Sequence, residues 1–199
     1  MTFSQCMMAI CPHCSSPKEL LNLTSGNTID AQQWSDAKTV APMLPQLSPV
    51  QKCPRCGRYF YLNEALQEMG ENYSSETGWL SFEETVEAYH ELCDGSPQQL
   101  QLFTLLVAWS YNDVIRNHQT PTDEQYQLFK TIVQDHLNRK VLSDNPLLKG
   151  ELYRETEAYD QCIATLQSFN PEEGFLLNIK NAILLQAQMK NNKVFVLEE

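Results

Sequence analysis

The sequence has few glycines and no long apolar run. Only 7 of its 199 residues are glycine, and it contains no phosphate-cradling loop, dinucleotide-binding fingerprint or G-x-S-x-G nucleophile turn. Its longest apolar stretch, residues 102–109, is interrupted by Thr104 and is far shorter than the roughly 20 residues that cross a bilayer. The opening residues MTFSQCMMAIC lack the basic segment of an export signal. We therefore expect no membrane crossing and no export, and we predict a cytoplasmic protein.

Residues that could support catalysis are also scarce. His90 and Glu91 lack the second histidine of an H-E-x-x-H zinc motif, and His118 and His136 stand apart in the sequence. An acidic stretch has the mixed helical spacing of a solvated face rather than of a catalytic carboxylate pair, and comprises Glu83, Glu84, Glu87 and Glu91. The sequence thus favours a non-enzymatic role, while leaving catalysis open.

Positive charge is in short supply. The chain has 14 lysines and arginines against 25 aspartates and glutamates, which gives a formal charge of −11. Residues 1–60 carry +2 and the remainder −13. Four thiolates around one Zn²⁺ ion would cancel that small excess. Because non-specific nucleic-acid affinity comes mainly from cations that neutralise phosphates, the composition argues against general duplex binding.

The sequence does contain two C-x-x-C motifs. Cys11 and Cys14 enclose Pro-His, while Cys53 and Cys56 enclose Pro-Arg. Each motif is typical of a tight turn whose amides point at thiolate sulfur atoms, and four thiolates match the tetrahedral preference of zinc. We predict one structural Zn²⁺ ion at Cys11, Cys14, Cys53 and Cys56. Redox dithiols, iron and disulfides are the alternatives, although neither motif has the strand-to-helix setting of a redox pair.

Other features near these motifs receive simpler interpretations. Four sulfur atoms complete a zinc shell, so His13 is expected to be a solvent-facing loop residue. Cys6, Cys93 and Cys162 are expected to be small buried apolar residues. The 38 residues between the two motifs exceed the usual spacing of about 15–20. The hairpin that joins the motifs must therefore carry a long insertion.

Turn signals and periodicity divide the chain into a strand-rich and a helical part. Short apolar stretches at 7–10, 20–23 and 59–62 are separated by Gly, Pro, Ser and Asn, which predicts short strands. Residues 63–80 have the composition of a connector with a short helix near 64–69. From Ser81 the apolar spacing becomes helical, and Tyr126, Phe129, Val133 and Leu137 predict one buried helix face.

Helix-start signals recur through the second part. Three capping pairs are Ser81 with Glu84, Thr122 with Gln125, and Asn170 with Glu173. Proline follows Asn145 and Asn170 at a first helical position. The predicted fold class is α+β, with a zinc-ribbon β module at 1–62, a connector at 63–80 and an all-α domain at 81–199. A short C-terminal strand at 193–197 is expected to pair with an exposed ribbon edge.

Two stretches resemble known families. The motifs C-P-H-C and C-P-R-C-G, followed by Tyr59-Phe60-Tyr61, resemble the zinc-ribbon, or rubredoxin-like, class across residues 5–62. The intervening residues 25–45 are similar to those of uncharacterised bacterial zinc-ribbon proteins. This resemblance implies a metal-stabilised fold and no particular activity.

A second resemblance lies in the C-terminal part. Residues 143–176 resemble one tetratricopeptide repeat in the spacing of Gly150, Tyr153, Tyr159, Cys162, Ile163 and Leu166. The pattern departs from the family at Glu157, where glycine is expected, and at Phe169, where a small residue is expected. An ordinary helical hairpin accounts for the same spacing.

These observations predict a non-enzymatic zinc-binding protein that acts as a protein-interaction or adaptor module for an unidentified protein partner. The alternative is a nucleic-acid-binding or regulatory role for the ribbon. It would use the charges of Lys52, Arg55 and Arg58, with Trp34, Tyr59 and Tyr61 available for base stacking. Those charges equally suit compensation of the thiolates. Trp34 lies in a polar setting and is expected to be partly buried against the ribbon.

Overall fold

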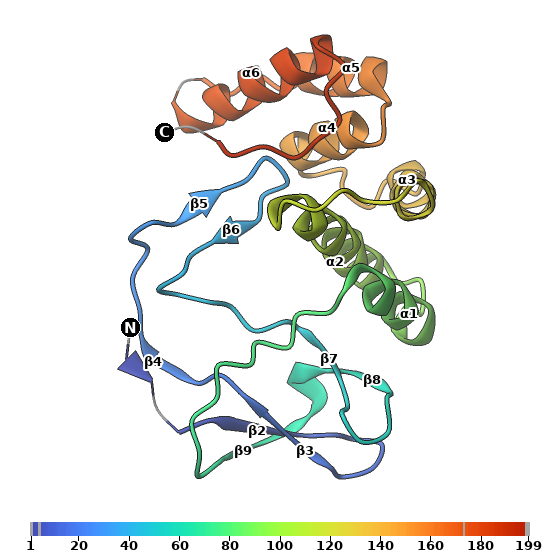
Figure 1. Cartoon of the computed structure of the whole chain (residues 1–199). Coiled ribbons are helices and arrows are strands. Elements are labelled where there is room, and N and C mark those ends of the chain that lie inside the picture. The colour runs from blue at the N-terminus through green and yellow to red at the C-terminus, as the bar shows by residue number, and fades with distance from the viewer. Residues whose placement is uncertain (1, 4, 173, 198–199) are drawn as a thin grey trace. The chain divides into compact units, whose positions relative to one another are not determined.

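The computed structural model describes residues 2–3, 5–172 and 174–197, and the chain forms two compact units (Figure 1). The first unit comprises Met1–Ala31 and Val40–Leu92, and the second comprises Gln32–Thr39 and Cys93–Glu199. The chain therefore passes between the units three times. The predicted α+β class is confirmed, with short strands in the N-terminal part and helices in the C-terminal part.

Short antiparallel strands build the first unit. In its three-stranded sheet, β2 (Met7–Ile10) lies between β3 (Pro17–Leu20) and β9 (Leu66–Met69). A separate hairpin pairs β7 (Val50–Lys52) with β8 (Tyr59–Tyr61), and β1 (Thr2–Phe3) pairs with β4 (Leu23–Ser25). The strands predicted at 7–10 and 59–62 are thus found, while the one predicted at 20–23 is divided between β3 and β4.

The predicted connector is part of this unit. Residues 63–80 contain β9 and most of a short 3-10 helix, η1 (Leu62–Glu64), instead of the expected short helix near 64–69. All four side chains of β9 are exposed, so no apolar alternation marks it as a strand. It is ordered by backbone pairing with β2, in the register Met7 to Met69 through Ile10 to Leu66. Backbone pairing between distant segments does not require a recognisable pattern of side chains in either segment.

Helix α1 (Phe82–Leu92) also belongs to the first unit. It begins with the predicted reciprocal cap, because the Glu84 N–H donates to Ser81 Oγ and the Ser81 N–H donates to the Glu84 carboxylate. Its acidic face contacts the β7–β8 hairpin, where the Tyr59 hydroxyl donates to Glu87 over 2.6 Å. The compact units thus differ from the predicted segments 1–62, 63–80 and 81–199, because these contacts join α1 to the strands.

Five helices form most of the second unit. They are α2 (Pro97–Arg116), α3 (Asp123–Asn138), α4 (Pro146–Glu155), α5 (Tyr159–Ser168) and α6 (Phe175–Gln188). The predicted starts at Thr122 and Asn145 are confirmed, since both side chains cap their helices. The start predicted at Asn170 is wrong: α6 begins at Phe175, after Gly174 with φ of 86°. Glu173 lies outside the described residues.

The helices pack through the predicted apolar faces. Phe129, Val133 and Leu137 of α3 are buried, and the Phe129 ring stacks on Tyr111 of α2 with centroids 4.3 Å apart. Helices α4 and α5 form an antiparallel hairpin. A Cβ atom added at Gly150 would lie 2.7 Å from Leu166, so glycine is what allows these two helices to approach. None of the helices in the described part of the chain combines the length and the apolar character that a bilayer crossing needs.

The long insertion supplies a hairpin to the second unit. It contains β5 (Gln32–Gln33) and β6 (Thr39–Val40), and the C-terminal segment pairs with it. The Ser35 N–H donates to the Phe195 carbonyl over 2.9 Å, and the Leu197 N–H donates to the Gln33 carbonyl over 2.8 Å. The predicted C-terminal pairing is therefore present, but its partner is the insertion rather than the sheet that carries the cysteine motifs.

Candidate metal centre

The two cysteine motifs form matching knuckles at the ends of β2 and β7. In the first, the Cys11 N–H donates to the Ser16 carbonyl and the Ser15 N–H donates back to the Cys11 carbonyl. In the second, Cys53 bonds to Arg58 and Gly57 in the same pattern. The fifth position of each knuckle has a left-handed backbone, with φ of 56° at Ser15 and 74° at Gly57. Repeated backbone geometry thus presents two cysteine pairs in the same way.

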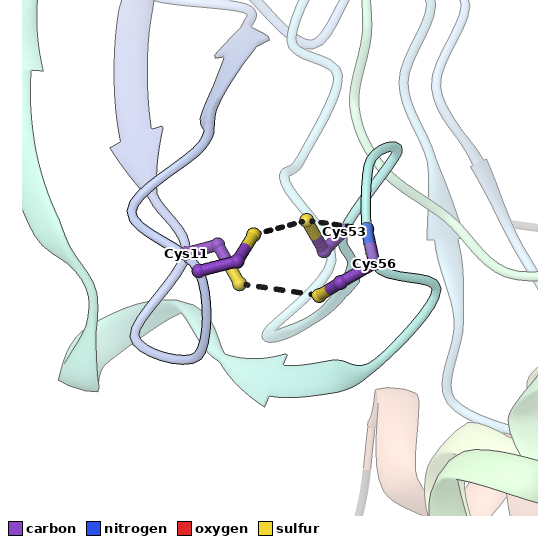
Figure 2. Close-up of side chains that lie close together, drawn as sticks. Cys11, Cys53 and Cys56 are labelled. Carbon is purple, nitrogen blue, oxygen red and sulfur yellow. Dashed lines mark hydrogen bonds between the residues drawn. The ribbon is translucent and has the colours of Figure 1, made fainter.

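The knuckles bring all four predicted ligands together. Figure 2 shows the side chains of Cys11, Cys53 and Cys56 directed toward one another. The Sγ atoms of Cys11 and Cys56 are 3.9 Å apart, those of Cys14 and Cys53 are 3.6 Å apart, and all four lie within 4.8 Å of one another. A tetrahedral ion with metal–sulfur bonds of about 2.3 Å requires sulfur–sulfur separations of about 3.8 Å. A disulfide requires about 2.05 Å. The four sulfur atoms are therefore close enough to hold a metal ion.

The electrostatics of the thiols also favour a cation between them. Burial is the largest single influence on Cys53 and raises its pKa, but the N–H groups of Cys56 and Arg55 together with the thiols of Cys56 and Cys11 lower the pKa to about 6. The Ser16 N–H lowers the pKa of Cys14, whereas burial and the neighbouring sulfur atoms raise it to about 12. Four thiolates at this spacing repel one another, and a divalent cation is the charge that offsets the repulsion.

The site is built into the core of the first unit. Cys11 and Cys53 are each 1% exposed and pack with Ala9, Leu20 and Phe60. Cys56 is exposed and Cys14 is half-buried. Folding therefore buries one sulfur of each knuckle and leaves the other near the surface, as expected of a site that supports a small core.

The predictions for His13 and for the three cysteines outside the motifs have mixed outcomes. His13 is exposed as predicted, but its Nε2 also lies 3.0 Å from the Tyr59 carbonyl, to which it donates. This contact joins the first knuckle to the strand that follows the second. Cys6 and Cys162 are buried as predicted, whereas Cys93 is half-buried.

Two basic residues that flank the second knuckle, Lys52 and Arg58, pair with acids of α1. Lys52 Nζ lies 2.9 Å from Glu84 Oε1, and Arg58 Nε lies 3.1 Å from Glu91 Oε1. Hydrogen bonding to Lys52 lowers the pKa of Glu84. Glu83, Glu87 and Glu91 are exposed, as the interpretation of this stretch as a solvated face predicts, and Glu84 is half-buried. Three of the four, Glu84, Glu87 and Glu91, also bond to the hairpin. Helical spacing alone did not reveal that a basic, aromatic hairpin packs against them.

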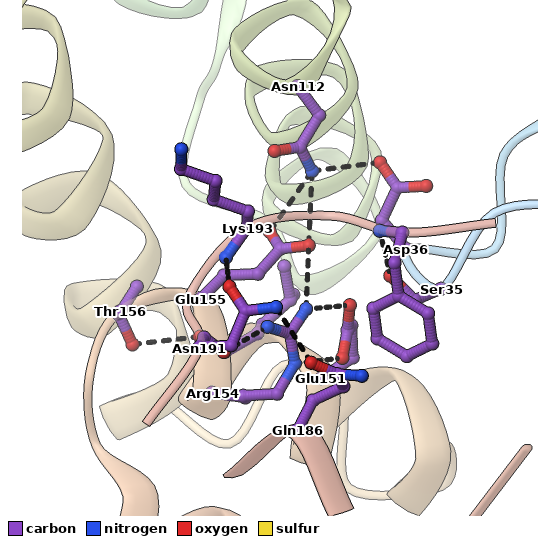
Figure 3. Close-up of polar contacts among 12 residues, drawn as sticks. Ser35, Asp36, Asn112, Glu151, Arg154, Glu155, Thr156, Gln186, Asn191 and Lys193 are labelled. Carbon is purple, nitrogen blue, oxygen red and sulfur yellow. Dashed lines mark hydrogen bonds and ion pairs between the residues drawn. The ribbon is translucent and has the colours of Figure 1, made fainter. Parts of the chain in front are cut away.

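A second polar cluster lies in the helical unit, and no sequence pattern predicted it (Figure 3). It centres on Asp36 of the insertion, which is fully buried. The Asn112 side-chain amide donates to Asp36 over 2.9 Å and to both Glu155 oxygens over 3.1 Å. Arg116 forms an ion pair with Asp36, and the Trp109 indole donates to the Asp36 carbonyl. These contacts fix the tip of the insertion hairpin in the helical unit.

Arg154 forms the other half of this cluster. Its guanidinium binds Glu151 through Nε at 2.8 Å and Nη2 at 2.5 Å, and all these atoms are buried. Nη2 also lies 3.9 Å from Glu155. Nη1 donates to the Asn191 carbonyl, which ties the chain after α6 to α4. The bidentate geometry compensates the charge of Arg154 in a dry environment.

The position of Trp34 differs from the prediction. It is half-buried, but it belongs to the second unit rather than to the unit that carries the cysteine motifs. Its ring lies 5.0 Å from the Arg116 guanidinium carbon, within cation–π range, and its backbone is bridged to Val196. No local sequence pattern indicates that the insertion passes from one unit to the other on either side of this residue.

The charges of this cluster balance only when one carboxyl is protonated. Three cations and four carboxylates are linked through it: Lys38, Arg116, Arg154, Asp36, Asp113, Glu151 and Glu155. Burial raises the pKa of Glu155 well above its ordinary value, and the negative charges of Glu151 and Asp36 raise it further. Arg154 opposes this shift without overcoming it. Burial also raises the pKa of Asp36, but Arg116 and Asn112 oppose that shift, so Glu155 is the carboxyl that we expect to carry the proton.

This protonation predicts a pH dependence of stability. Folding raises the pKa of Glu155 above 4.5, so its contribution is fully present below that value and is lost as pH rises toward the folded-state pKa. Glu155→Gln keeps an accepting oxygen and cannot ionise. We expect the free energy of unfolding of the variant, relative to that of the wild type, to increase as the pH rises above the ordinary glutamate pKa of 4.5, measured by urea unfolding. Parallel pH profiles for the two proteins would show that Glu155 is not the protonated group.

Known proteins offer no assignment for either cluster. Comparisons with protein-family models, with curated proteins and with solved structures find no match for this chain. The convergence of four cysteines on one point is accordingly the chemical feature on which a functional assignment rests.

Proposed function

We propose that the protein is a non-enzymatic adaptor whose N-terminal zinc ribbon is held together by one structural Zn²⁺ ion. The observation that carries the proposal is the placement of four sulfur atoms within 4.8 Å of one another, on two knuckles of matching backbone geometry. Such a donor set offers zinc a closed shell, which suits a structural role. Four-sulfur sites also take iron, whose thiolate complexes are coloured, whereas those of zinc are colourless.

The adaptor role is supported by the helical unit. Large apolar side chains are exposed along α6, at fractions of 48% for Phe175, 48% for Leu176 and 55% for Leu185. Grouped exposed apolar residues mark interaction surfaces in soluble domains. We further propose that α4 and α5 form one tetratricopeptide-like pair. The close contact at Gly150 supports this, as does the left-handed turn at Glu157, where φ is 62° and the family has glycine.

A nucleic-acid-binding or regulatory role for the ribbon has less support. Lys52 and Arg58 are engaged by Glu84 and Glu91. Tyr59, one of the aromatic residues considered for base stacking, is only 3% exposed. Phosphate binding by these cations would first have to displace their carboxylate partners, which reduces any gain in affinity.

One pair of measurements on the full chain distinguishes the two roles. Fluorescence anisotropy with labelled single-stranded and duplex DNA is expected to show no salt-sensitive binding. Photo-crosslinking from the exposed face of α6 is expected to give a defined protein adduct in cell extract, absent when the same crosslinker replaces the exposed Glu124 of α3. Salt-sensitive DNA binding that is lost in Lys52→Gln and Arg58→Gln would favour the nucleic-acid role and overturn the adaptor role.

A further inference from the structure

The C-terminal segment adds a third strand to the insertion hairpin and leaves one edge open. Trp34 lies in the middle, with its N–H donating to Lys38 and its carbonyl accepting from Ala37 on one side. On the other side, Phe195 and Leu197 bond to Ser35 and Gln33, and Trp34 faces Val196. Because successive residues of a strand direct their N–H and C=O groups to opposite sides, those of Val196 point away from the hairpin.

A groove lies along this open edge. In Figure 1 the C-terminal segment runs between β5 and α6. A cavity of about 400 Å³ is lined by Phe195, Val196 and Leu197 on one side and by α6 on the other. The α6 residues that line it include Phe175, Ile179, Ala182 and Leu185, which recur at the spacing of one helix face. The volume is that of a typical ligand site.

The chemistry of the groove indicates its occupant. Every side chain that lines it is uncharged, in a chain whose net charge is −11. Among the described residues, the Val196 N–H and C=O have no hydrogen-bond partner, and Val196 is 38% exposed. An open strand edge is completed by another strand, which supplies the missing backbone hydrogen bonds. A helix in the same place would leave this edge unpaired.

We propose that this groove binds an extended, uncharged apolar peptide segment of a partner protein by strand addition to Val196. The inference rests on the proposed adaptor role and names its recognition surface. Alternate side chains of the peptide lie on the apolar face of α6, near Ile179 and Ala182, and give selectivity. The peptide residue opposite Val196 must keep its N–H, so proline is excluded there.

Two leucines of α6 provide a matched test. Leu185 is 55% exposed and lines the groove, while Leu176 is 48% exposed on the same helix and does not line it. Leu185→Gln is expected to weaken peptide binding about tenfold or more, because it removes apolar area that the peptide covers. Leu176→Gln is expected to leave the affinity unchanged. Both sites are exposed, so neither substitution disturbs the core.

The probe is a phage-displayed library of random heptapeptides, panned against the full chain. We expect enrichment of uncharged sequences rich in β-branched residues, and selected peptides should bind wild type and Leu176→Gln alike but Leu185→Gln weakly. Amide exchange supplies an independent readout. The Val196 amide should exchange fast in the free protein and become protected with peptide, whereas the Leu197 amide, bonded to Gln33, should be protected in both.

Any of four outcomes would overturn the inference. The first three are a failure to enrich any peptide, selected peptides whose affinity is unchanged by Leu185→Gln, and a Val196 amide that stays unprotected with peptide bound. Self-association that is lost in Leu185→Gln would make a second copy the occupant and also overturn it. If photo-crosslinking still captures a protein partner, the adaptor role stands and only this groove is excluded. If neither experiment finds a partner, both proposals fail.

Discussion

Replacing Cys53 by serine is expected to unfold the first unit. The Cys53 sulfur is one of the four converging sulfur atoms, and its residue is 1% exposed within the core formed with Ala9, Leu20 and Phe60. Structural zinc contributes an apparent binding free energy of about 10–16 kcal/mol in small domains, more than the short strands here can supply from their own core. A serine hydroxyl is a poor zinc ligand at neutral pH, so most of this contribution is lost.

The second unit is expected to keep its helices after the same change. Its helices have their own caps at Ser96, Thr122 and Asn145 and a separate buried core. Cys53→Ser, or a strong chelator, should therefore preserve most of the far-ultraviolet helical signal while making residues 40–80 sensitive to limited proteolysis. Cys93→Ser is the control, because Cys93 is half-buried and outside the cluster. Unchanged protease resistance in Cys53→Ser would contradict a structural role for the site.

Replacing Arg154 by leucine is expected to destabilise the second unit by about 3–5 kcal/mol. Arg154 and Glu151 are both fully buried and form a bidentate pair. Removing the guanidinium leaves the Glu151 charge buried without its counterion, and it also leaves the Asn191 carbonyl without its donor. The cost thus comes mainly from the groups left behind, rather than from the arginine side chain itself.

Arg139 provides the matched control for this substitution. It pairs with Asp135 at 2.9 Å, but the two side chains are 55% and 49% exposed. Because water screens such pairs, Arg139→Leu is expected to change stability by less than about 1 kcal/mol. Urea unfolding followed by circular dichroism measures both variants under the same conditions. Equal costs for Arg154→Leu and Arg139→Leu would show that the buried pair is not needed for the stability of this unit.

Local signals in the sequence predicted the parts of the fold that depend on neighbouring residues. The C-x-x-C spacing sets the knuckle turns by itself, so the four cysteines that converge were named without knowledge of the fold. The caps at Ser81, Thr122 and Asn145 were found for the same reason, since a side chain three residues before an N–H is a local arrangement. Asn170 shows the limit of such signals, because a suitable residue followed by proline begins no helix there.

Features that depend on distant partners were not predicted. Asp36 is a charged residue in a polar stretch, and only its contacts with Asn112 and Arg116, more than seventy residues away, make it a buried group. The exposed strand β9 is ordered by backbone pairing with β2, which no side-chain pattern reports. In both cases the energy comes from pairing across the fold, and the sequence near each residue is compatible with a solvated loop.

The metal content of the purified full chain tests the central proposal most directly. Native mass spectrometry combined with elemental analysis is expected to find one zinc ion per chain, and none in Cys53→Ser, because three remaining sulfur atoms leave the shell open. A coloured protein that contains iron in place of zinc would support the four-cysteine site but contradict the proposal that its metal is zinc. Wild-type protein without any metal, or Cys53→Ser that retains one zinc per chain with unchanged stability, would contradict the four-cysteine centre itself.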